Sequence, residues 1–281
     1  MPHSIQRRLL GLTAALALFA STPAPAQTGE EVPFITSPDN VTLEMLRIAN
    51  VGASDHVIDL GSGDGRIVIL AARRFGATGL GVEYDPELVR RSQRAAQEAG
   101  VADRVSFREQ DLFATDLAPA TVITMYLLQE FNLRLRPALL ALKPGTRIVS
   151  HDWDMGDWTA DQSTQLPVPD KAVGREKSSM VYLWLVPARV EGLWCGTGLL
   201  RTAALELSQR YQMVAGTLMH RNRSRPLEGR LQGATLRATA GRHGELVLDA
   251  SGNELRITSA QGALVLAQDQ TFRRAAGPGC N

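Results

Sequence analysis

A glycine-rich loop between an apolar strand and an amphipathic helix constrains this chain more than any other feature. The stretch Val57-Ile58-Asp59-Leu60-Gly61-Ser62-Gly63-Asp64-Gly65-Arg66 places three glycines at alternate positions where the predicted strand gives way to the predicted helix. Glycine permits positive φ and lets bare backbone approach a ligand. The free N–H groups at the start of the helix favour an anionic group, such as a carboxylate or a phosphate. The loop therefore predicts a ligand site.

Acidic residues near the ends of three consecutive predicted strands narrow the choice of ligand. Asp59 could hold a cationic amine or order the loop, and Glu83 stands where a carboxylate accepts hydrogen bonds from a ribose diol. Asp111 could accept from the exocyclic amine of a purine. Arg66 replaces the third small residue of a dinucleotide site, which disfavours NAD and FAD. These groups together describe S-adenosylmethionine; the alternative is a tight turn with acids that cap helices.

Two regions with different patterns of apolar and turn-forming residues follow one another along the chain. Residues 34–188 alternate strand-like and helical stretches, which predicts βαβ units and a mostly parallel sheet. Residues 190–275 hold short alternating segments between turn residues, which predicts an antiparallel β domain. Ser37 is a candidate N-cap, with Pro38 as the first helical residue. The predicted helices cover residues 38–50, 66–75, 86–100 and 133–142, and the predicted strands cover 57–60, 79–83, 105–107, 120–126, 146–150 and 180–186, the last of them antiparallel at the sheet edge.

Further motifs along the first region support a family resemblance. They are Ser37-Pro38, the loop extended through Ile67-Val68-Ile69, Tyr126-Leu127-Leu128, Asn132-Leu133, Leu135-Arg136-Pro137, Leu142-Lys143-Pro144-Gly145-Thr146, Ser150-His151-Asp152-Trp153 and Gly156-Asp157-Trp158. With them, residues 34–158 resemble a class I S-adenosylmethionine-dependent methyltransferase. More narrowly, they resemble the ATP-synthase c-subunit lysine methyltransferases and their bacterial relatives.

This resemblance implies a Rossmann-like α/β sheet and methyl transfer from S-adenosylmethionine to a protein lysine. The β domain departs from the family's mitochondrial members. The residues implied to bind the cofactor are Asp59, Gly61, Ser62, Gly63, Gly65, Glu83 and Asp111. The alternative function is that of an exported binding or scaffold protein with an inactive methyltransferase fold, although a scaffold would need none of these residue types.

Candidate catalytic residues follow the fourth and fifth predicted strands. His151 is a candidate base, Asp152 could hold an amine, and nearby aromatic faces would attract a cation. Tyr126 could line the acceptor channel. The chain lacks the Asn-Pro-Pro-Tyr run of amide-methylating enzymes, which disfavours DNA adenine or a glutamine amide as acceptor. The alternative is that this segment is a strand end with a turn, and that Tyr126, Trp153 and Trp158 pack in the core.

The C-terminal region resembles small lipocalin-like barrels. Gly192-Leu193-Trp194 opens it, and Arg273-Arg274 supplies a late arginine that would pack on the tryptophan. Cys195 and Cys280 could form a disulfide, or both could be free buried thiols. From residue 190 onward there are eleven arginines, no lysines and seven acids. Arg221, Arg223 and Arg225 are expected in one loop, which is either a contact for an acidic partner or phospholipid headgroups or a solvated hairpin tip.

The N-terminus has the order of a secretory signal peptide. Residues 1–26 contain a basic start, a twelve-residue apolar run and Ala24-Pro25-Ala26. This predicts a cleaved, periplasmic or exported protein, with an inner-membrane anchor as the alternative. The overall net charge of +1 argues against a protein that coats nucleic acid, and the scattered His and Cys residues indicate no metal site. The expected partner is a protein substrate, which could be associated with a membrane.

Overall fold

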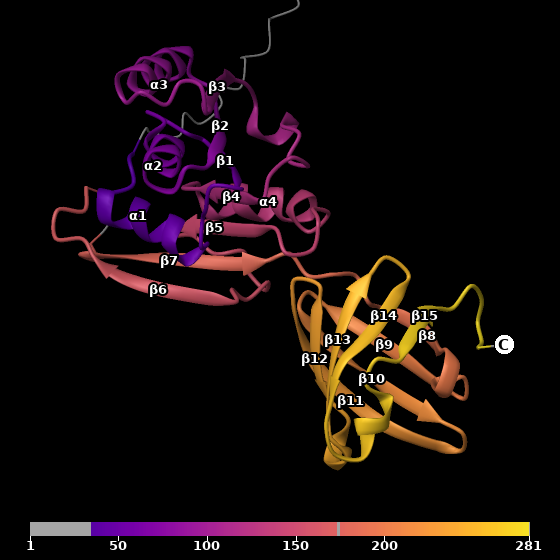
Figure 1. Cartoon of the computed structure of the whole chain (residues 1–281). Coiled ribbons are helices and arrows are strands. Elements are labelled where there is room, and N and C mark those ends of the chain that lie inside the picture. The colour runs from indigo at the N-terminus through magenta and orange to yellow at the C-terminus, as the bar shows by residue number, and fades with distance from the viewer. Residues whose placement is uncertain (1–34, 173–174, 281) are drawn as a thin grey trace, which may run out of the picture. The chain divides into compact units, whose positions relative to one another are not determined.

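An open sheet and a closed barrel make up the described part of the chain. The structure is a computed structural model and describes residues 35–172 and 175–280 (Figure 1). The open sheet has seven strands in the order β3-β2-β1-β4-β5-β7-β6, and the barrel closes in the order β10-β11-β12-β13-β14-β15-β8-β9. The predicted α/β sheet followed by a small antiparallel barrel is confirmed. The predicted signal peptide, residues 1–26, lies outside the described residues.

The open sheet is parallel except at one side. Strands β1 to β5 run parallel, β7 is antiparallel to β5, and β6 is antiparallel to β7. The predicted antiparallel pairing of β7 is correct, but its predicted place at the edge is wrong, because β6 forms the edge. The strands are β1 (His56–Leu60), β2 (Thr78–Glu83), β3 (Val105–Glu109), β4 (Val122–Met125), β5 (Arg147–His151), β6 (Gln162–Pro167) and β7 (Ser178–Leu185). The strand order reverses between β1 and β4, where open α/β sheets bind ligands at the carboxyl ends of their strands.

Among the described residues, one α-helix precedes β1 and three connect strands of the sheet. They are α1 (Asp39–Ile48), α2 (Arg66–Phe75), α3 (Pro86–Glu98) and α4 (Gln129–Leu139). Gly65 and Gly76 flank α2 in the left-handed conformation, so the helix predicted at residues 66–75 is confirmed. The predicted cap of α1 is wrong: Pro38 occupies the N-cap position and the helix begins at Asp39. The hydroxyl of Ser37 instead lies 2.8 Å from Nδ1 of the buried His151. If Ser37 capped the helix, its hydroxyl would not be available for this contact.

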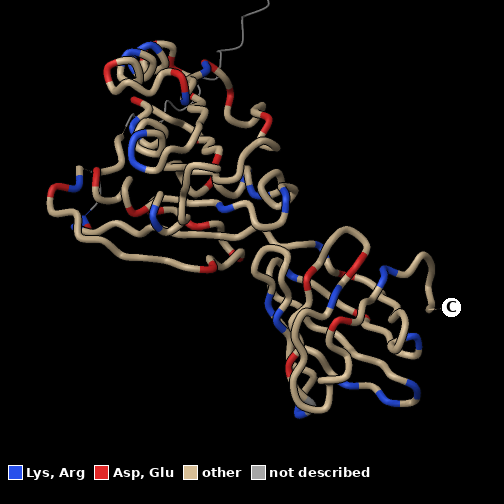
Figure 2. The backbone as a smooth tube through the Cα atoms, in the orientation of Figure 1, with Lys and Arg blue, Asp and Glu red and all other residues tan. Residues whose placement is uncertain are grey.

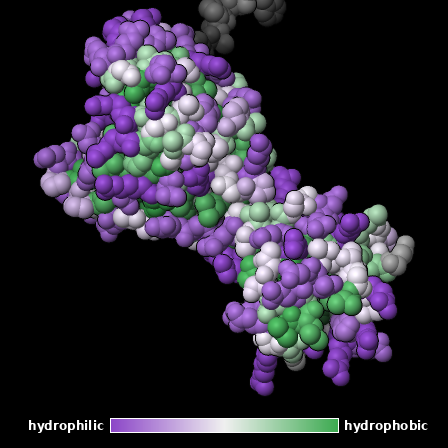
Figure 3. Space-filling model, viewed as in Figure 1, coloured by the Kyte–Doolittle hydropathy of each residue, from purple (hydrophilic) through white to green (hydrophobic). Residues whose placement is uncertain are grey.

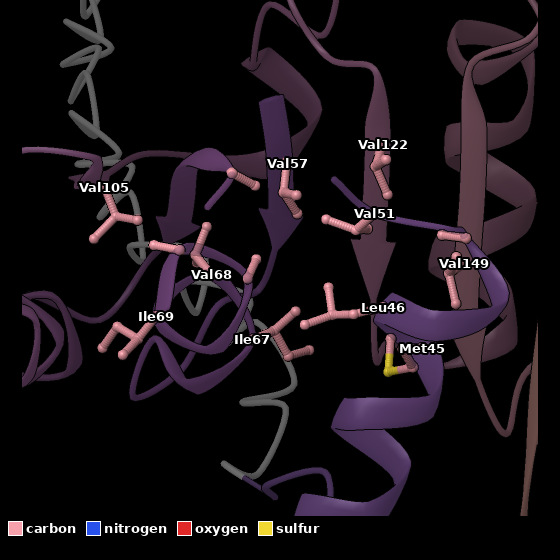
Figure 4. Close-up of a cluster of buried hydrophobic side chains, with 14 of the residues drawn as sticks. Met45, Leu46, Val51, Val57, Ile67, Val68, Ile69, Val105, Val122 and Val149 are labelled. Carbon is pink, nitrogen blue, oxygen red and sulfur yellow. The ribbon is translucent and has the colours of Figure 1, made fainter. Parts of the chain in front are cut away.

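The apolar faces of α1 and α2 pack on one face of the sheet (Figure 4). Met45 and Leu46 of α1 and Val68 of α2 are fully buried against valines from the central strands, such as Val57 and Val122. Burying an apolar side chain of this size stabilises the fold by roughly 1.5 to 3 kcal/mol before conformational entropy is subtracted. This packing holds the strand ends, and therefore the glycine loop, in a fixed frame.

The barrel is filled by its own side chains. Its strands are β8 (Gly192–Gly196), β9 (Ala203–Arg210), β10 (Met213–His220), β11 (Arg223–Gln232), β12 (Thr235–Thr239), β13 (Glu245–Ser251), β14 (Glu254–Ala260) and β15 (Thr271–Arg274). Trp194, Leu205, Leu248 and Phe272 lie in its hydrophobic core. The prediction of a loop that holds all three clustered arginines is wrong. Residues 223 and 225 belong to β11, whose ladder to β10 extends to the end of the hairpin.

Two further contacts close the barrel. The guanidinium of Arg274 lies 4.2 Å from the ring centroid of Trp194, as the lipocalin-like pattern predicts. Cys195 and Cys280 form a disulfide, which decides between the two alternatives for these cysteines. Within the described residues, no helix combines the length and the apolar character needed to span a bilayer.

Candidate active site

The glycine loop is held against the end of β2. The N–H groups of Gly61 and Ser62 both donate to the carbonyl of Val82 at 2.9 Å. Gly61, Gly63 and Gly65 all have positive φ, of 73°, 54° and 77°. These values lie in the left-handed region that favours glycine. The loop therefore presents backbone rather than side chains at the carboxyl end of β1.

Glu83 is oriented for a ligand by three backbone donors. Its Oε2 accepts from the N–H of Gly63 at 2.9 Å, and its Oε1 accepts from the N–H groups of Tyr84 and Asp85 at 2.7 and 3.1 Å. A carboxylate has about four acceptor sites, so one stays available for a ribose hydroxyl. Tyr84 is 81 % exposed beside it, and an exposed aromatic face next to such a carboxylate could pack on a base. Sequence analysis missed Tyr84, although its place directly after the acid could have indicated it.

Asp59 is a buried carboxyl at the end of β1. It is 2 % exposed and accepts a 2.7 Å hydrogen bond from the hydroxyl of Thr124. Burial raises its pKa to about 7, and the nearby carboxylates of Glu83 and Asp64 add to the effect. A cation bound beside Asp59 would favour its charged form. The amine of S-adenosylmethionine supplies such a cation.

The surroundings of Ser62 and Gly81, next to the glycine loop, also suit a bound ligand. The buried hydroxyl of Ser62 has no hydrogen-bond partner among the described residues, which is unusual unless a ligand or water provides one. A Cβ at Gly81 would lie 2.4 Å from the ring of Phe107 and 2.7 Å from the Ser62 Oγ. The ring of Phe107 and the Ser62 side chain therefore pack closely against Gly81, and the Ser62 hydroxyl is left for a ligand or water to pair with.

Asp111 lies beyond β3, and its strand is the neighbour of β2. Its Oδ1 accepts from the N–H of Phe113 at 2.8 Å and so caps the short helix η1 (Leu112–Ala114), while the side chain stays exposed. Asp59 lies near the end of β1, Glu83 is the last residue of β2 and Asp111 lies just beyond β3, so the three acids mark the carboxyl ends of adjacent strands. This is the arrangement that the sequence predicts for the amine, the ribose and the base.

The candidate catalytic residues lie together after β4 and β5. The ring of Tyr126 stacks on that of His151 with centroids 3.9 Å apart. His151 is 1 % exposed, and its Nδ1 and Nε2 lie 2.8 and 2.9 Å from the hydroxyls of Ser37 and Ser179. Burial lowers the pKa of His151 to about 4, so the imidazole is neutral near pH 7. With both nitrogens engaged, His151 is placed to fix the position of Tyr126.

Asp152 presents a carboxylate that already binds a lysine. Its φ is 60°, and its Oδ1 accepts from the N–H of Met180 at 2.9 Å. Its Oδ2 lies 2.7 Å from Nζ of Lys171, which also donates to the carbonyl of Ser178 at 2.7 Å. Sequence analysis missed Lys171, because only the antiparallel strand β7 brings its loop to the end of β5.

A buried asparagine holds the segment that follows β5. Asn132 on α4 donates to the hydroxyl of Ser150 at 3.1 Å and to the carbonyl of Trp153 at 3.0 Å. Trp158 is fully buried in the core, as the structural alternative expected, whereas Trp153 is 39 % exposed. Tyr182 of β7 completes the cluster, and burial and the carboxylates of Asp154 and Asp152 raise its pKa.

Comparison with known proteins decides the family. A family model described as the ANTKMT methyltransferase domain matches residues 59–162. The chain is 38 % identical over 160 residues to a protein-lysine N-methyltransferase of Saccharolobus islandicus, across 55 % of this chain and 94 % of that protein. The chain belongs to the family of this protein-lysine methyltransferase. It is also 30 % identical to the mouse lysine N-methyltransferase of the ATP synthase c-subunit, across 54 % of this chain and 62 % of the mouse protein.

A solved structure supports the assignment of the cofactor. The methyltransferase has a TM-score of 0.50 and 48 % identity to a crystal structure described as an RNA methyltransferase from Salinibacter ruber in complex with S-adenosyl-L-homocysteine. The match covers 56 % of this chain and 96 % of that one. The chain is therefore an S-adenosylmethionine-dependent methyltransferase, and the cofactor predicted from the sequence is confirmed.

Proposed function

We propose that this methyltransferase modifies the side-chain amine of a lysine in a protein substrate. The observation that carries the proposal is the ion pair of Asp152 with Lys171, because it shows that the cluster after β5 stabilises a lysine ammonium. The 38 % identical relative is described as a protein-lysine N-methyltransferase, which supports the same substrate class.

The residues of the cluster suit an amine acceptor. S-adenosylmethionine supplies an electrophilic methyl group on a sulfonium. The acceptor amine must lose its proton to water before its lone pair attacks the methyl carbon. The bond from that carbon to sulfur then breaks, and S-adenosylhomocysteine leaves as a neutral thioether. Partial burial favours the neutral amine. The arriving ammonium would displace Lys171 from Asp152 Oδ2 and take its place. Tyr126, fixed against His151, would position the amine for in-line attack and help exclude water.

An RNA acceptor is the competing proposal, since the similar Salinibacter ruber structure is described as an RNA methyltransferase. Residues 34–188 contain twenty acidic and sixteen basic side chains. Figure 2 shows both signs interspersed over the open sheet and its helices. Binding of RNA relies on neutralising phosphates with clustered lysines and arginines, and this balance disfavours it. An inactive scaffold is disfavoured by the complete cofactor site.

The experiment measures where a labelled methyl group goes. The full chain is incubated with methyl-labelled S-adenosylmethionine and cell extract from a strain that lacks the gene. We expect protease to release the label, nuclease to leave it in place, and amino-acid analysis to recover methyllysine. Asp152→Asn should lower kcat/KM by roughly 100-fold while cofactor affinity is retained. Asp116→Asn, which removes an exposed carboxylate that accepts from the N–H of Ala118, serves as the control.

Label in nucleic acid, or full activity of Asp152→Asn, would contradict the proposal.

Two further parts of the proposed function concern where the protein and its substrate are located. Residues 1–26 support export, and N-terminal sequencing of the protein from cells should then begin at Gln27. A membrane-associated substrate is the second part, and the acceptor recovered in the labelling experiment tests it.

A further inference from the structure

Four connections gather at one end of the barrel. They are η2 (Gly198–Leu200), the turn between β10 and β11, η3 (Gly241–His243) and η4 (Gly262–Ala267). Because neighbouring strands alternate in direction, all four follow or precede strands at the same end. The N–H of Arg221 donates to the carbonyl of Thr202 at 3.2 Å, and the N–H of Gln261 donates to the carbonyl of Glu245 at 2.9 Å. We refer to these connections, residues 197–202, 220–223, 240–244 and 261–270, as the loop end.

Large apolar side chains project from the loop end. Leu199 is 74 % exposed, Val265 is 54 % exposed and Leu266 is 87 % exposed. Figure 3 shows a group of hydrophobic residues on the barrel surface among hydrophilic ones. Elsewhere in the described barrel, Met213 at the opposite end of β10 is the other large hydrophobic residue with high exposure. Exposed apolar side chains at projecting connections, rather than in a pocket, suit insertion into a soft apolar phase.

Arginines surround these apolar side chains. The exposed ones are Arg201, Arg221, Arg223 and Arg242, with the half-buried Arg225 nearby. The acids at this end are Glu228, Glu245 and Asp269, and Asp269 lies 3.5 Å from Arg256. The guanidinium group binds phosphate oxygens in a bidentate manner, which a lysine cannot do. From residue 190 onward the chain has eleven arginines and no lysine.

We propose that the loop end docks on the surface of an anionic phospholipid bilayer. Leu199, Val265 and Leu266 would enter the boundary between headgroups and acyl chains. The arginines would bind the phosphates around them. Both contributions are needed, since a few apolar side chains alone give marginal membrane binding and basic groups alone give salt-sensitive binding. An anionic bilayer would use both the positive charge and the exposed apolar side chains of the loop end. An acidic protein would use the positive charge but would leave the apolar side chains unexplained.

The first test places an environment-sensitive dye at the loop end. Full-length Leu266→Cys is labelled with a nitrobenzoxadiazole dye and mixed with vesicles of one part phosphatidylglycerol to two parts phosphatidylcholine. We expect a blue shift and a several-fold rise in emission, which high salt and pure phosphatidylcholine vesicles abolish. The same dye on Met213→Cys, at the opposite end of the barrel, should not respond. The two labelled proteins have the same N-terminus, with or without residues 1–26, so binding through the N-terminal apolar run cannot create the difference.

The second test reverses single charges. Arg221→Glu should weaken sedimentation with the anionic vesicles by roughly tenfold or more, since each basic residue near the surface contributes about fivefold. Arg237→Glu is the matched control, because Arg237 is exposed on β12 away from the loop end. An unresponsive dye at position 266, an equal response at position 213, or equal losses in the two arginine variants would overturn the proposal.

Discussion

The open sheet and the barrel differ most in what they bury. Polar side chains are buried throughout the sheet region, among them Asp59, Ser62, Asn132 and His151. Within the described barrel, Gln212 is the single buried polar residue of this kind. Burial of a polar group is unfavourable unless hydrogen bonds compensate, so a fold tends to keep such groups where they have a use. The contrast assigns the chemistry to the sheet.

The interior of the barrel differs from the sheet region because apolar side chains fill it. Its interior is filled with side chains such as Trp194, Leu248 and Phe272, as in small barrels that enclose no ligand. A filled interior leaves the outer surface of the barrel for contacts with partners. The following predictions test this division, from the largest expected effect to the smallest.

Loss of the Glu83 carboxylate should affect the sheet site most. Glu83→Ala removes a charged acceptor of the ribose, worth about 1.5 to 3 kcal/mol, and leaves the N–H of Gly63 in the glycine loop without its acceptor, so affinity for S-adenosylmethionine should fall roughly a hundredfold or more. Calorimetric titration of the full chain measures this. Glu87→Ala, at an exposed position on α3, is the control and should bind normally. Equal affinities of the two variants would remove the ribose role from Glu83.

A cavity in the barrel should change stability without changing cofactor affinity. Leu248 is fully buried on β13, and Leu248→Ala should lower the free energy of unfolding by about 3 kcal/mol. Chemical denaturation followed by tryptophan fluorescence measures the loss. The dissociation constant of S-adenosylmethionine, measured under native conditions, should stay within about twofold of the original. A large change in that constant would show that the barrel helps to form the sheet site.

The pH dependence of cofactor binding should reveal the buried carboxyl. Because the pKa of Asp59 is raised to about 7, the carboxylate that attracts the cofactor's amine forms as the pH rises. Affinity should increase about tenfold from about pH 5.5 to about pH 7, below the titration of a free α-amine.

The same shift has a second consequence for the ligand-free protein. A raised folded-state pKa contributes stability at low pH, and this contribution disappears as the pH rises from 3.8 to about 7. Asp59→Asn should remove both pH dependences, whereas Asp116→Asn should preserve them. A pH-independent affinity in the original chain would contradict the assigned role of Asp59.

The sequence predicts those parts of the molecule whose signals are local. The glycine pair Gly65 and Gly76 defines both ends of α2, and Glu83 follows from its distance to the loop. Strand β6 escapes prediction because it is a largely exposed edge with polar residues. Strand β11 escapes because Pro226 and three arginines resemble a loop, although pairing with β10 and β12 makes it a strand.

The catalytic cluster shows a second limit of prediction. His151 and Asp152 stand out because they end a strand next to aromatic residues. Their partners Ser37, Lys171 and Ser179 come from remote segments that the pairing of β7 with β5 and the start of α1 bring together. No pattern within any of these segments indicates the contact.

The short pairing between β15 and β8 has a consequence for the independence of the barrel. Three residue pairs join the barrel's last strand to its first, and the disulfide between Cys195 and Cys280 fastens the same place. The two ends of the barrel segment therefore meet, so its closure requires no strand from the sheet region. Such a cassette can be joined to a host by one short connection. The barrel is therefore separable in topology from the methyltransferase sheet that precedes it.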